Sequence, residues 1–144
     1  PEVWADVEFI AAAREDVPDC ARYRCWLEAA LLGPEPVAMV APVIAGFLRV
    51  VTNPRVFTHP STLDDALAFV DAALAAPAAV APALSERLTV TLAKVCHRAG
   101  ATADRVPDAY LAAIALDLDA ELVTADRGFA RFEGLRRRHP FGPR

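Results

Sequence analysis

The chain has 144 residues, 55% of them hydrophobic, and a formal net charge of −4. This composition excludes disordered, collagen-like and coiled-coil proteins, and we expect a single domain over residues 1–144 that buries its own core. No apolar run reaches the roughly 18 residues of a membrane span, and no secretory signal pattern opens the sequence, so we expect a cytoplasmic protein. The three cysteines lack metal-ligand spacing, and we interpret them as free thiols.

The charges are unevenly distributed along the chain. Residues 1–126 carry 9 basic and 18 acidic side chains, whereas residues 127–144 carry six arginines and one glutamate. The net charge argues against contact with nucleic acid, but the basic end of the chain is suited to phosphate contacts. Because an arginine-rich, lysine-poor composition is also typical of a GC-rich genome, both interpretations stay open.

Short apolar segments alternate with helical patterns. In chain order we expect a strand at 3–7, a helix at 20–32, a strand at 36–40, helices at 42–51 and 61–76, a strand at 79–83, helices at 85–100 and 108–118, and strands at 121–125 and 135–139. Asp19 is the expected cap of the first helix, and Pro107 is expected at the start of the last. This alternation predicts an α/β fold with a mostly parallel sheet.

Three aspartates are predicted to meet at one edge of this sheet. Asp6 lies near the end of the first strand, Asp126 follows the strand at 121–125, and Asp108 opens the helix that leads back to that strand. In an open parallel sheet, functional groups gather beyond the carboxyl ends of the strands. Carboxylates so close together repel one another unless a cation neutralises them. Oxygen-only ligands favour Mg²⁺ or Mn²⁺, which can activate water for attack on a phosphodiester.

The same residues also have a purely structural explanation. An aspartate at the start of a helix or just after a strand is often only a cap or a turn residue, and this applies to Asp108 and Asp126 taken singly. Asp104 and Glu8 are further candidate ligands, with solvated side chains as the alternative interpretation. Metal-dependent phosphoryl chemistry is favoured only because three carboxylates are predicted at one edge.

Several segments together resemble a known family. They are residues 46–57 (GFLRVVTNPRVF), 106–113 (VPDAYLAA), 122–129 (LVTADRGF) and 135–140 (LRRRHP). In this order they resemble the PIN-domain ribonucleases and, more narrowly, the VapC-type toxins of bacterial, especially mycobacterial, toxin–antitoxin systems. The resemblance implies a three-layer α/β/α PIN-like domain that acts as a metal-dependent endoribonuclease.

The resemblance also implies roles for individual residues. Asp6, Asp108 and Asp126 would be the catalytic residues that hold Mg²⁺ or Mn²⁺, and Thr124 would orient the site. In the family, the aspartate that ends the first strand is followed two residues later by Asn or Ser, and Glu8 stands at that place here. If residues 14–16 are aligned with the family without a gap, Ala5 rather than Asp6 falls at the position of the metal ligand.

Arginines near the predicted edge are candidate RNA ligands. Arg49 and Arg55 flank a loop that we expect near the site, and Arg138 belongs to the basic run at the end of the chain. A terminal arginine run can instead serve to prevent pairing at a sheet edge. The resemblance implies a homodimer, an RNA substrate and a cognate antitoxin whose carboxy-terminal segment lies over the site and the early helices.

Two other functions stay open. A catalytically silent PIN-like protein would bind without cleaving, and it is favoured by the irregular match of the first strand, with Glu8 in place of Asn or Ser. Gly46 stands where many family members have a glutamate in the middle helix, as expected for the branch that this sequence resembles. A phosphoacceptor signalling domain also gathers acidic residues at strand ends. It needs a lysine at the end of a late strand, whereas the single lysine, Lys94, is predicted inside a helix.

Overall fold

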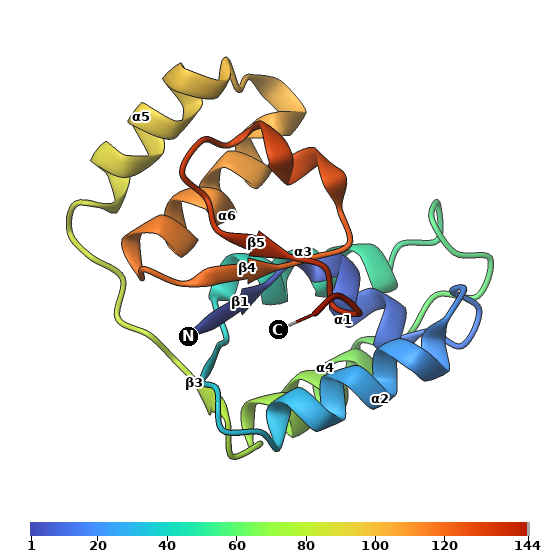
Figure 1. The fold of residues 1–144 in the computed structure, drawn as a ribbon. Coiled ribbons are helices and arrows are strands. Elements are labelled where there is room, and N and C mark those ends of the chain that lie inside the picture. The colour runs from blue at the N-terminus through green and yellow to red at the C-terminus, as the bar shows by residue number, and fades with distance from the viewer. Residues whose placement is uncertain (144) are drawn as a thin grey trace.

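The computed structural model describes residues 1–143 and shows a twisted central sheet with helices on both sides (Figure 1). The elements in chain order are β1 (Glu2–Trp4), α1 (Asp6–Ala13), α2 (Cys20–Leu31), β2 (Val37–Ala38), α3 (Ala41–Val51), α4 (Leu63–Leu74), β3 (Ala79–Val80), α5 (Leu88–Ala99), the 3-10 helix η1 (Ala103–Arg105), α6 (Val106–Asp117), β4 (Glu121–Val123), the 3-10 helix η2 (Arg127–Arg131) and β5 (Arg137–Arg138).

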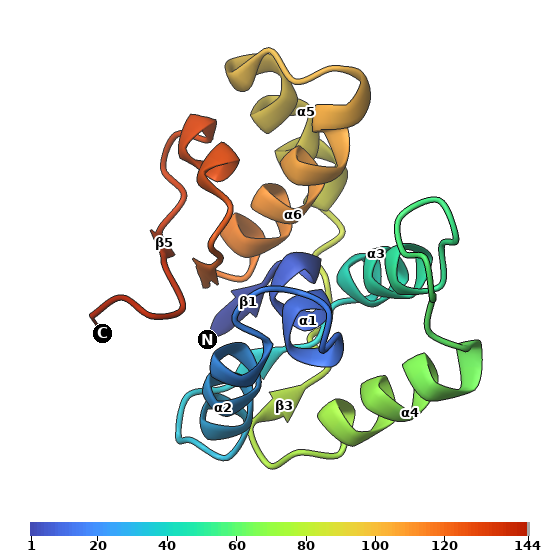
Figure 2. The same ribbon diagram turned by 90° about the vertical axis from the view of Figure 1, so that its right-hand side faces the viewer.

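The five strands lie in the order β3-β2-β1-β4-β5, and every neighbouring pair is parallel. Helices α1 to α4 pack in a chain of contacts on one side, and α5 packs on α6 on the other, which gives three layers (Figure 2). The predicted α/β fold with a parallel sheet is therefore confirmed. From β1 to β3 the strands are added on one side of β1, and from β4 onward they are added on the other side, so the strand order reverses between β1 and β4. Ligands of such folds bind beyond the carboxyl ends of the strands at this reversal point.

The core is built on the two central strands and on α6. Val3, Trp4, Leu122 and Val123 are at most 1% exposed, as expected for strands covered on both faces. Helix α6 is apolar almost all round, and residues 111–115 are buried. Its alanines allow close approach to the sheet, so the first turn of α6 is held rigidly at the edge where β1 and β4 end.

The structure shows how three of the predicted helices begin. Thr62 caps α4, because its hydroxyl oxygen accepts the backbone N–H of Asp65 at 3.1 Å. The predicted cap of α2 is wrong: Asp19 precedes the helix with a φ of 62°, and its side chain makes no capping hydrogen bond. Helix α5 begins at Leu88 rather than at Ser85, whose N–H is donated to the Asp117 carboxylate at 3.0 Å.

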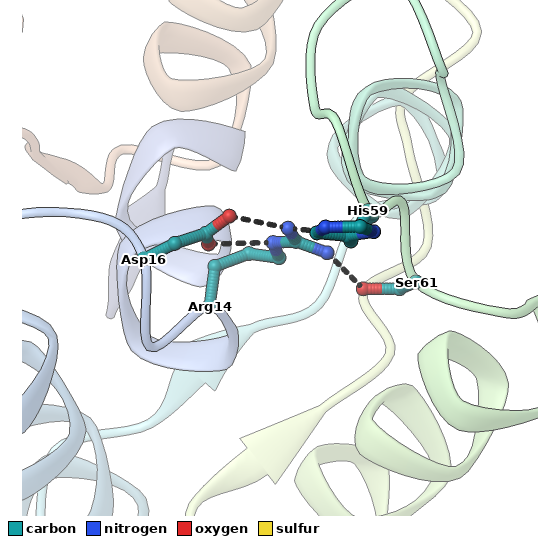
Figure 3. Close-up of polar contacts among 4 residues, drawn as sticks. All are labelled: Arg14, Asp16, His59 and Ser61. Atoms are coloured by element: carbon teal, nitrogen blue, oxygen red, sulfur yellow. Dashed lines mark hydrogen bonds and ion pairs between the residues drawn. The ribbon is translucent and has the colours of Figure 1, made fainter.

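A buried arginine at the end of α1 fixes the loop between α3 and α4 (Figure 3). The Arg14 guanidinium donates to both carboxylate oxygens of Asp16 at 2.6 and 2.9 Å, to the His59 carbonyl at 2.8 Å and to the Ser61 hydroxyl at 3.0 Å. It also lies 4.0 Å from the centre of the Phe57 ring. This single side chain thereby holds the loop that carries Arg55, one of the predicted RNA ligands.

Within residues 1–143, no helix is both long and apolar enough to cross a membrane. The cysteines Cys20, Cys25 and Cys96 are free, as the sequence predicted.

Candidate active site

A cavity of about 680 Å³ opens at the carboxyl edge of the central strands. Its lining includes two of the predicted ligands, Asp6 at the start of α1 and Asp108 in the first turn of α6. Helix α3 closes another side with Gly46 and Arg49, and Asp104 of η1 lies at the rim. The cavity combines acidic groups with one arginine, which is a suitable charge pattern for a cation and a phosphate together.

The strand register explains why Asp6 and Asp126 lie close enough to interact electrostatically although they are distant in the sequence. Trp4 on β1 pairs with Val123 on β4, and the two aspartates follow these residues by two and three positions. Asp108 reaches the same edge because α6 returns the chain from this edge to the start of β4. The carboxyl ends of β1 and β4 lie at the same edge of the sheet (Figure 1), and Asp6 and Asp108 line one cavity there, whereas Asp126 lies outside its lining.

The three carboxylates influence one another electrostatically. Burial raises the pKa of Asp6, and the charge of Asp126 raises it further, while Arg49 acts in the opposite direction. Burial also raises the pKa of Asp108, with added repulsion from Asp126 and Asp6 and partial relief from Arg131. Partly buried carboxylates that repel one another are stabilised when a cation binds among them.

The turn after β4 is held by hydrogen bonds of its own side chains. The Asp126 N–H is donated to the Thr124 hydroxyl at 3.1 Å, and Asp126 Oδ1 accepts the Gly128 N–H at 2.7 Å. Asp126 is therefore the cap of η2, so the structural explanation holds for one of its oxygens. Asp126 Oδ2 accepts no hydrogen bond from the described residues.

Glu8 lies in the interior beneath this turn rather than in the cavity lining. Its side chain is 0% exposed, and its Oε1 accepts the backbone N–H of Ala125 at 2.6 Å. Its Oε2 finds no partner among residues 1–143, and burial raises the pKa of this carboxyl to about 7. The interpretation of Glu8 as a solvated residue is therefore wrong. Its helical spacing to Ala5 and Ala12, both buried, is the sequence signal that could have placed it inside.

Gly46 gives α3 room to approach the site. A Cβ built at this position would lie 2.7 Å from Asp6 Oδ2, closer than any ordinary contact. The Asp6 carboxylate thus occupies the space that a side chain at position 46 would fill. Only the three-dimensional approach of α3 to α1 shows this, since nothing in the sequence indicates that position 46 lies against Asp6.

The remaining candidates differ in their surroundings. Arg49 and Asp104 line the cavity and are exposed, whereas Arg55 lies outside the lining, in the exposed part of the loop held by Arg14. Arg138 is 9% exposed and pairs with Glu2 at 2.5 Å and with Glu121 at 3.4 Å. The predicted RNA contact of Arg138 is at odds with this position, because two carboxylates between strands already engage its guanidinium.

Within residues 1–143, no three Asp, Glu, Cys or His side chains approach closely enough to enclose a metal ion. The predicted ligands thus lie at one edge of the sheet and interact electrostatically, but they do not surround a single position from several sides. This arrangement fits Mg²⁺ or Mn²⁺ better than zinc, because Mg²⁺ is usually held by one or two carboxylates with water and substrate oxygens in the other positions.

Comparisons with known proteins agree with this architecture. The model of the PIN domain family matches residues 6–135. The VapC ribonuclease Mb2897 of Mycobacterium bovis is 45% identical over 131 residues, which cover 91% of this chain and 89% of that protein. Ribonuclease VapC25 of Mycobacterium tuberculosis is 40% identical over 131 residues, 91% of this chain and 92% of its own.

Two solved structures have the same fold. One is VapBC2 from Rickettsia felis bound to a DNA fragment from their promoter, with a TM-score of 0.70 and 18% identity over 96% of this chain and 97% of that chain. The other is FitAB bound to the IR36 DNA fragment, with a TM-score of 0.69 and 16% identity over 100% and 98% of the two chains. The matched domain and the identity to the mycobacterial proteins, together with the fold, show that this chain belongs to the PIN-domain family and, within it, to the VapC group.

Proposed function

We propose that this chain is a divalent-metal-dependent endoribonuclease and the toxin of a toxin–antitoxin pair. The observation that carries the proposal is the gathering of Asp6, Asp108 and Asp126 at the reversal point of the sheet, where the charge of Asp126 raises the pKa of both Asp6 and Asp108. The identity to proteins named VapC ribonucleases, over about nine-tenths of both chains, supports it.

The residues present fit a hard divalent cation such as Mg²⁺ or Mn²⁺. Carboxylate oxygens are the anionic donors of the cavity, and Asp6 and Asp108 in its lining are the direct candidates. Asp126 follows β4 at the same edge but lies outside the lining. Burial and the charge of Asp126 raise the pKa of Asp6 and of Asp108, so a cation bound at this edge would favour the charged form of both carboxyls. When bound, such a cation supplies the Lewis acidity that hydrolysis of a phosphodiester requires.

The surrounding residues prepare this site. Gly46 leaves the Asp6 carboxylate in the cavity, and Arg49, one turn further along α3, offers a positive charge to a phosphate. Glu8 and Thr124 hold the turn after β4 and so fix the direction of Asp126. These contacts position the carboxylates before substrate arrives, which lowers the cost of ordering them during the reaction.

The function is tested by incubating the purified chain with a mixed-sequence RNA in Mg²⁺ or Mn²⁺ and again in EDTA. Cleavage with either cation and none in EDTA is expected. A calorimetric titration with Mn²⁺ tests the silent alternative separately: a folded chain that binds no Mn²⁺ at millimolar concentration would favour a binding protein over an enzyme. The phosphoacceptor alternative loses its essential group, because Lys94 lies in the middle of α5.

We also propose a cognate antitoxin and a second copy of the chain as protein partners. An apolar groove of about 430 Å³ lies between α2 and α4, and Leu32 in its lining is 72% exposed. An exposed leucine beside an apolar groove is typical of a surface that a partner covers. Light scattering of the chain alone and of the chain co-expressed with the product of the adjacent gene tests both assemblies.

A further inference from the structure

A second hollow surface leads away from the carboxylates along α5. One part, of about 180 Å³, lies between α5 and η2 and is lined by Lys94, Arg98, Arg131 and Glu133 among others. An adjoining part, of about 290 Å³, continues toward the start of α5 and includes Arg87. The two parts share Thr91, Lys94 and Leu116, so they form one continuous trough, which we call the α5 trough.

The cations of the α5 trough lie on one side of the helix. Positions 87, 94 and 98 are separated by seven and four residues, which places them in a stripe along about 16 Å of helix. Arg131 of η2 faces the end of this stripe from across the trough. Four basic side chains therefore line a surface on which Asp117 and Glu133 are the acidic members.

These four basic side chains have no internal partner. Within residues 1–143, none of the four makes a side-chain hydrogen bond or an ion pair, although the chain carries an excess of acidic residues. By contrast, Arg14, Arg136 and Arg138 are all paired with carboxylates. The unpaired cations of the trough are thus available to an external polyanion.

The trough is connected to the candidate active site through Arg131. The Arg131 guanidinium lies 3.5 Å from the position that a Cβ of Gly128 would take. The Gly128 backbone N–H in turn donates a hydrogen bond to the Asp126 carboxylate. Arg131 also acts on the pKa of Asp108. A polyanion lying in the trough would therefore be led to the carboxylates at the end of the sheet.

We propose that the α5 trough binds the phosphodiester backbone of single-stranded RNA adjacent to the site of cleavage. This rests on the proposed ribonuclease function and adds a substrate-binding surface to it. The aromatic residue of the lining, Phe132, is buried, so no ring is presented for stacking on bases. The contacts are therefore made to phosphates and are independent of base sequence.

Salt dependence of RNA binding tests this surface. The probe is a fluorescein-labelled 16-nucleotide oligouridylate, measured by anisotropy between 50 and 200 mM NaCl with Ca²⁺ in place of Mg²⁺ and with probe integrity checked on a gel. Each phosphate contact removed should lower the slope of log affinity against log salt by about 0.7. The double variant Lys94→Gln with Arg98→Gln should therefore lose about 1.4 of slope, which is about sevenfold less weakening across this salt range.

Arg136→Gln is the matched control for Arg98→Gln, because it removes one arginine that is paired with Asp119. The control should keep the parent slope, and Arg98→Gln should lose about 0.7. Equal slopes in the parent and the trough variants would overturn the proposal, as would failure of the parent chain to bind the probe at 50 mM NaCl.

A deca-glutamate peptide distinguishes RNA from an acidic protein segment. If the peptide binds the parent but not the trough variants, while the RNA slopes stay equal, the trough belongs to a protein partner and the proposal is wrong. Cleavage in Mg²⁺ is recorded in parallel. If the parent chain cleaves RNA but the trough variants keep its salt slope, the proposed function stands and only the proposal for the α5 trough is wrong. If the parent chain does not cleave RNA, the proposed function itself is wrong.

Discussion

The buried carboxylate of Glu8 accepts the backbone N–H of Ala125 at 2.6 Å and thereby ties α1 to the turn that carries Asp126. The two residues are far apart in sequence, and the register of β1 against β4 brings them together. This one hydrogen bond therefore helps to position two of the aspartates, because Asp6 begins α1 and Asp126 directly follows Ala125.

Glu8 makes the stability of the metal-free chain depend on pH. Its pKa is raised from 4.5 to about 7 in the folded state, so the folded chain binds the proton more tightly than the unfolded chain. The contribution of Glu8 to the free energy of unfolding should be greatest below about pH 4.5 and fall by up to about 3 kcal/mol as pH rises through about 7. Urea unfolding in EDTA at several pH values measures this, and Glu8→Gln should remove most of the fall. A Glu8→Gln chain with the parent's pH profile would contradict this placement.

Gly46→Ala separates the stability of α3 from the function of the site. Replacing glycine by alanine inside a helix ordinarily adds about 1 kcal/mol, but here the new methyl group would press on Asp6 Oδ2. We expect little net change in stability and at least a tenfold loss of Mn²⁺ affinity, measured by urea unfolding and calorimetry. In an Asp6→Ala background the contact is absent, and the gain of about 1 kcal/mol should reappear. Unchanged Mn²⁺ affinity in Gly46→Ala would show that the two residues do not interfere.

Arg14→Met tests whether the Arg14 hydrogen bonds hold the loop between α3 and α4 in place. The change removes charged hydrogen bonds to the His59 carbonyl and the Ser61 hydroxyl, so we expect a loss of about 2–3 kcal/mol in urea unfolding. Tryptic cleavage after the exposed Arg55 should also become faster in the variant. A cleavage rate equal to that of the parent would mean that the loop is held by other contacts.

Asp16→Asn is the control for Arg14→Met, because it removes only the ion pair with Arg14. The Arg14 guanidinium holds the pKa of Asp16 below its usual value, so their pairing contributes above about pH 4 and is lost as pH falls through the lowered pKa. Because Asp16 is exposed, the variant should be only slightly destabilised at neutral pH and should keep the parent's tryptic rate.

Arg138→Met distinguishes a structural arginine from an RNA ligand. Its loss leaves Glu2 buried without its cation, and we expect destabilisation of about 3–5 kcal/mol in urea unfolding. The folded fraction should bind the labelled oligouridylate with the salt slope of the parent. Arg137→Met, which changes an exposed neighbour, should leave stability nearly unchanged. A reduced slope in Arg138→Met would restore Arg138 as an RNA ligand.

The sequence predicts the order of strands and helices well because hydrophobic periodicity and turn residues act locally. It predicts the edge shared by Asp6, Asp108 and Asp126 because parallel strands end on the same side of a sheet. It does not show that Glu8 faces the core, because a buried carboxylate depends on a hydrogen-bond donor, and this backbone N–H comes from the turn after β4, far along the chain. The pairing of Arg138 with Glu2 also arises only when β5 and β1 lie on either side of β4.

The most direct test of the account is the rate of RNA cleavage in Mg²⁺ or Mn²⁺ by the parent chain, by Asp108→Asn and by Asp71→Asn. Asp108 lines the cavity, whereas Asp71 is an exposed residue of α4, and both changes remove one carboxylate charge. We predict that Asp108→Asn cleaves at least 100-fold more slowly while keeping the parent's unfolding midpoint within the error, and that Asp71→Asn cleaves at the parent's rate. Full cleavage by a folded Asp108→Asn chain would contradict the assignment of this carboxylate edge as the active site.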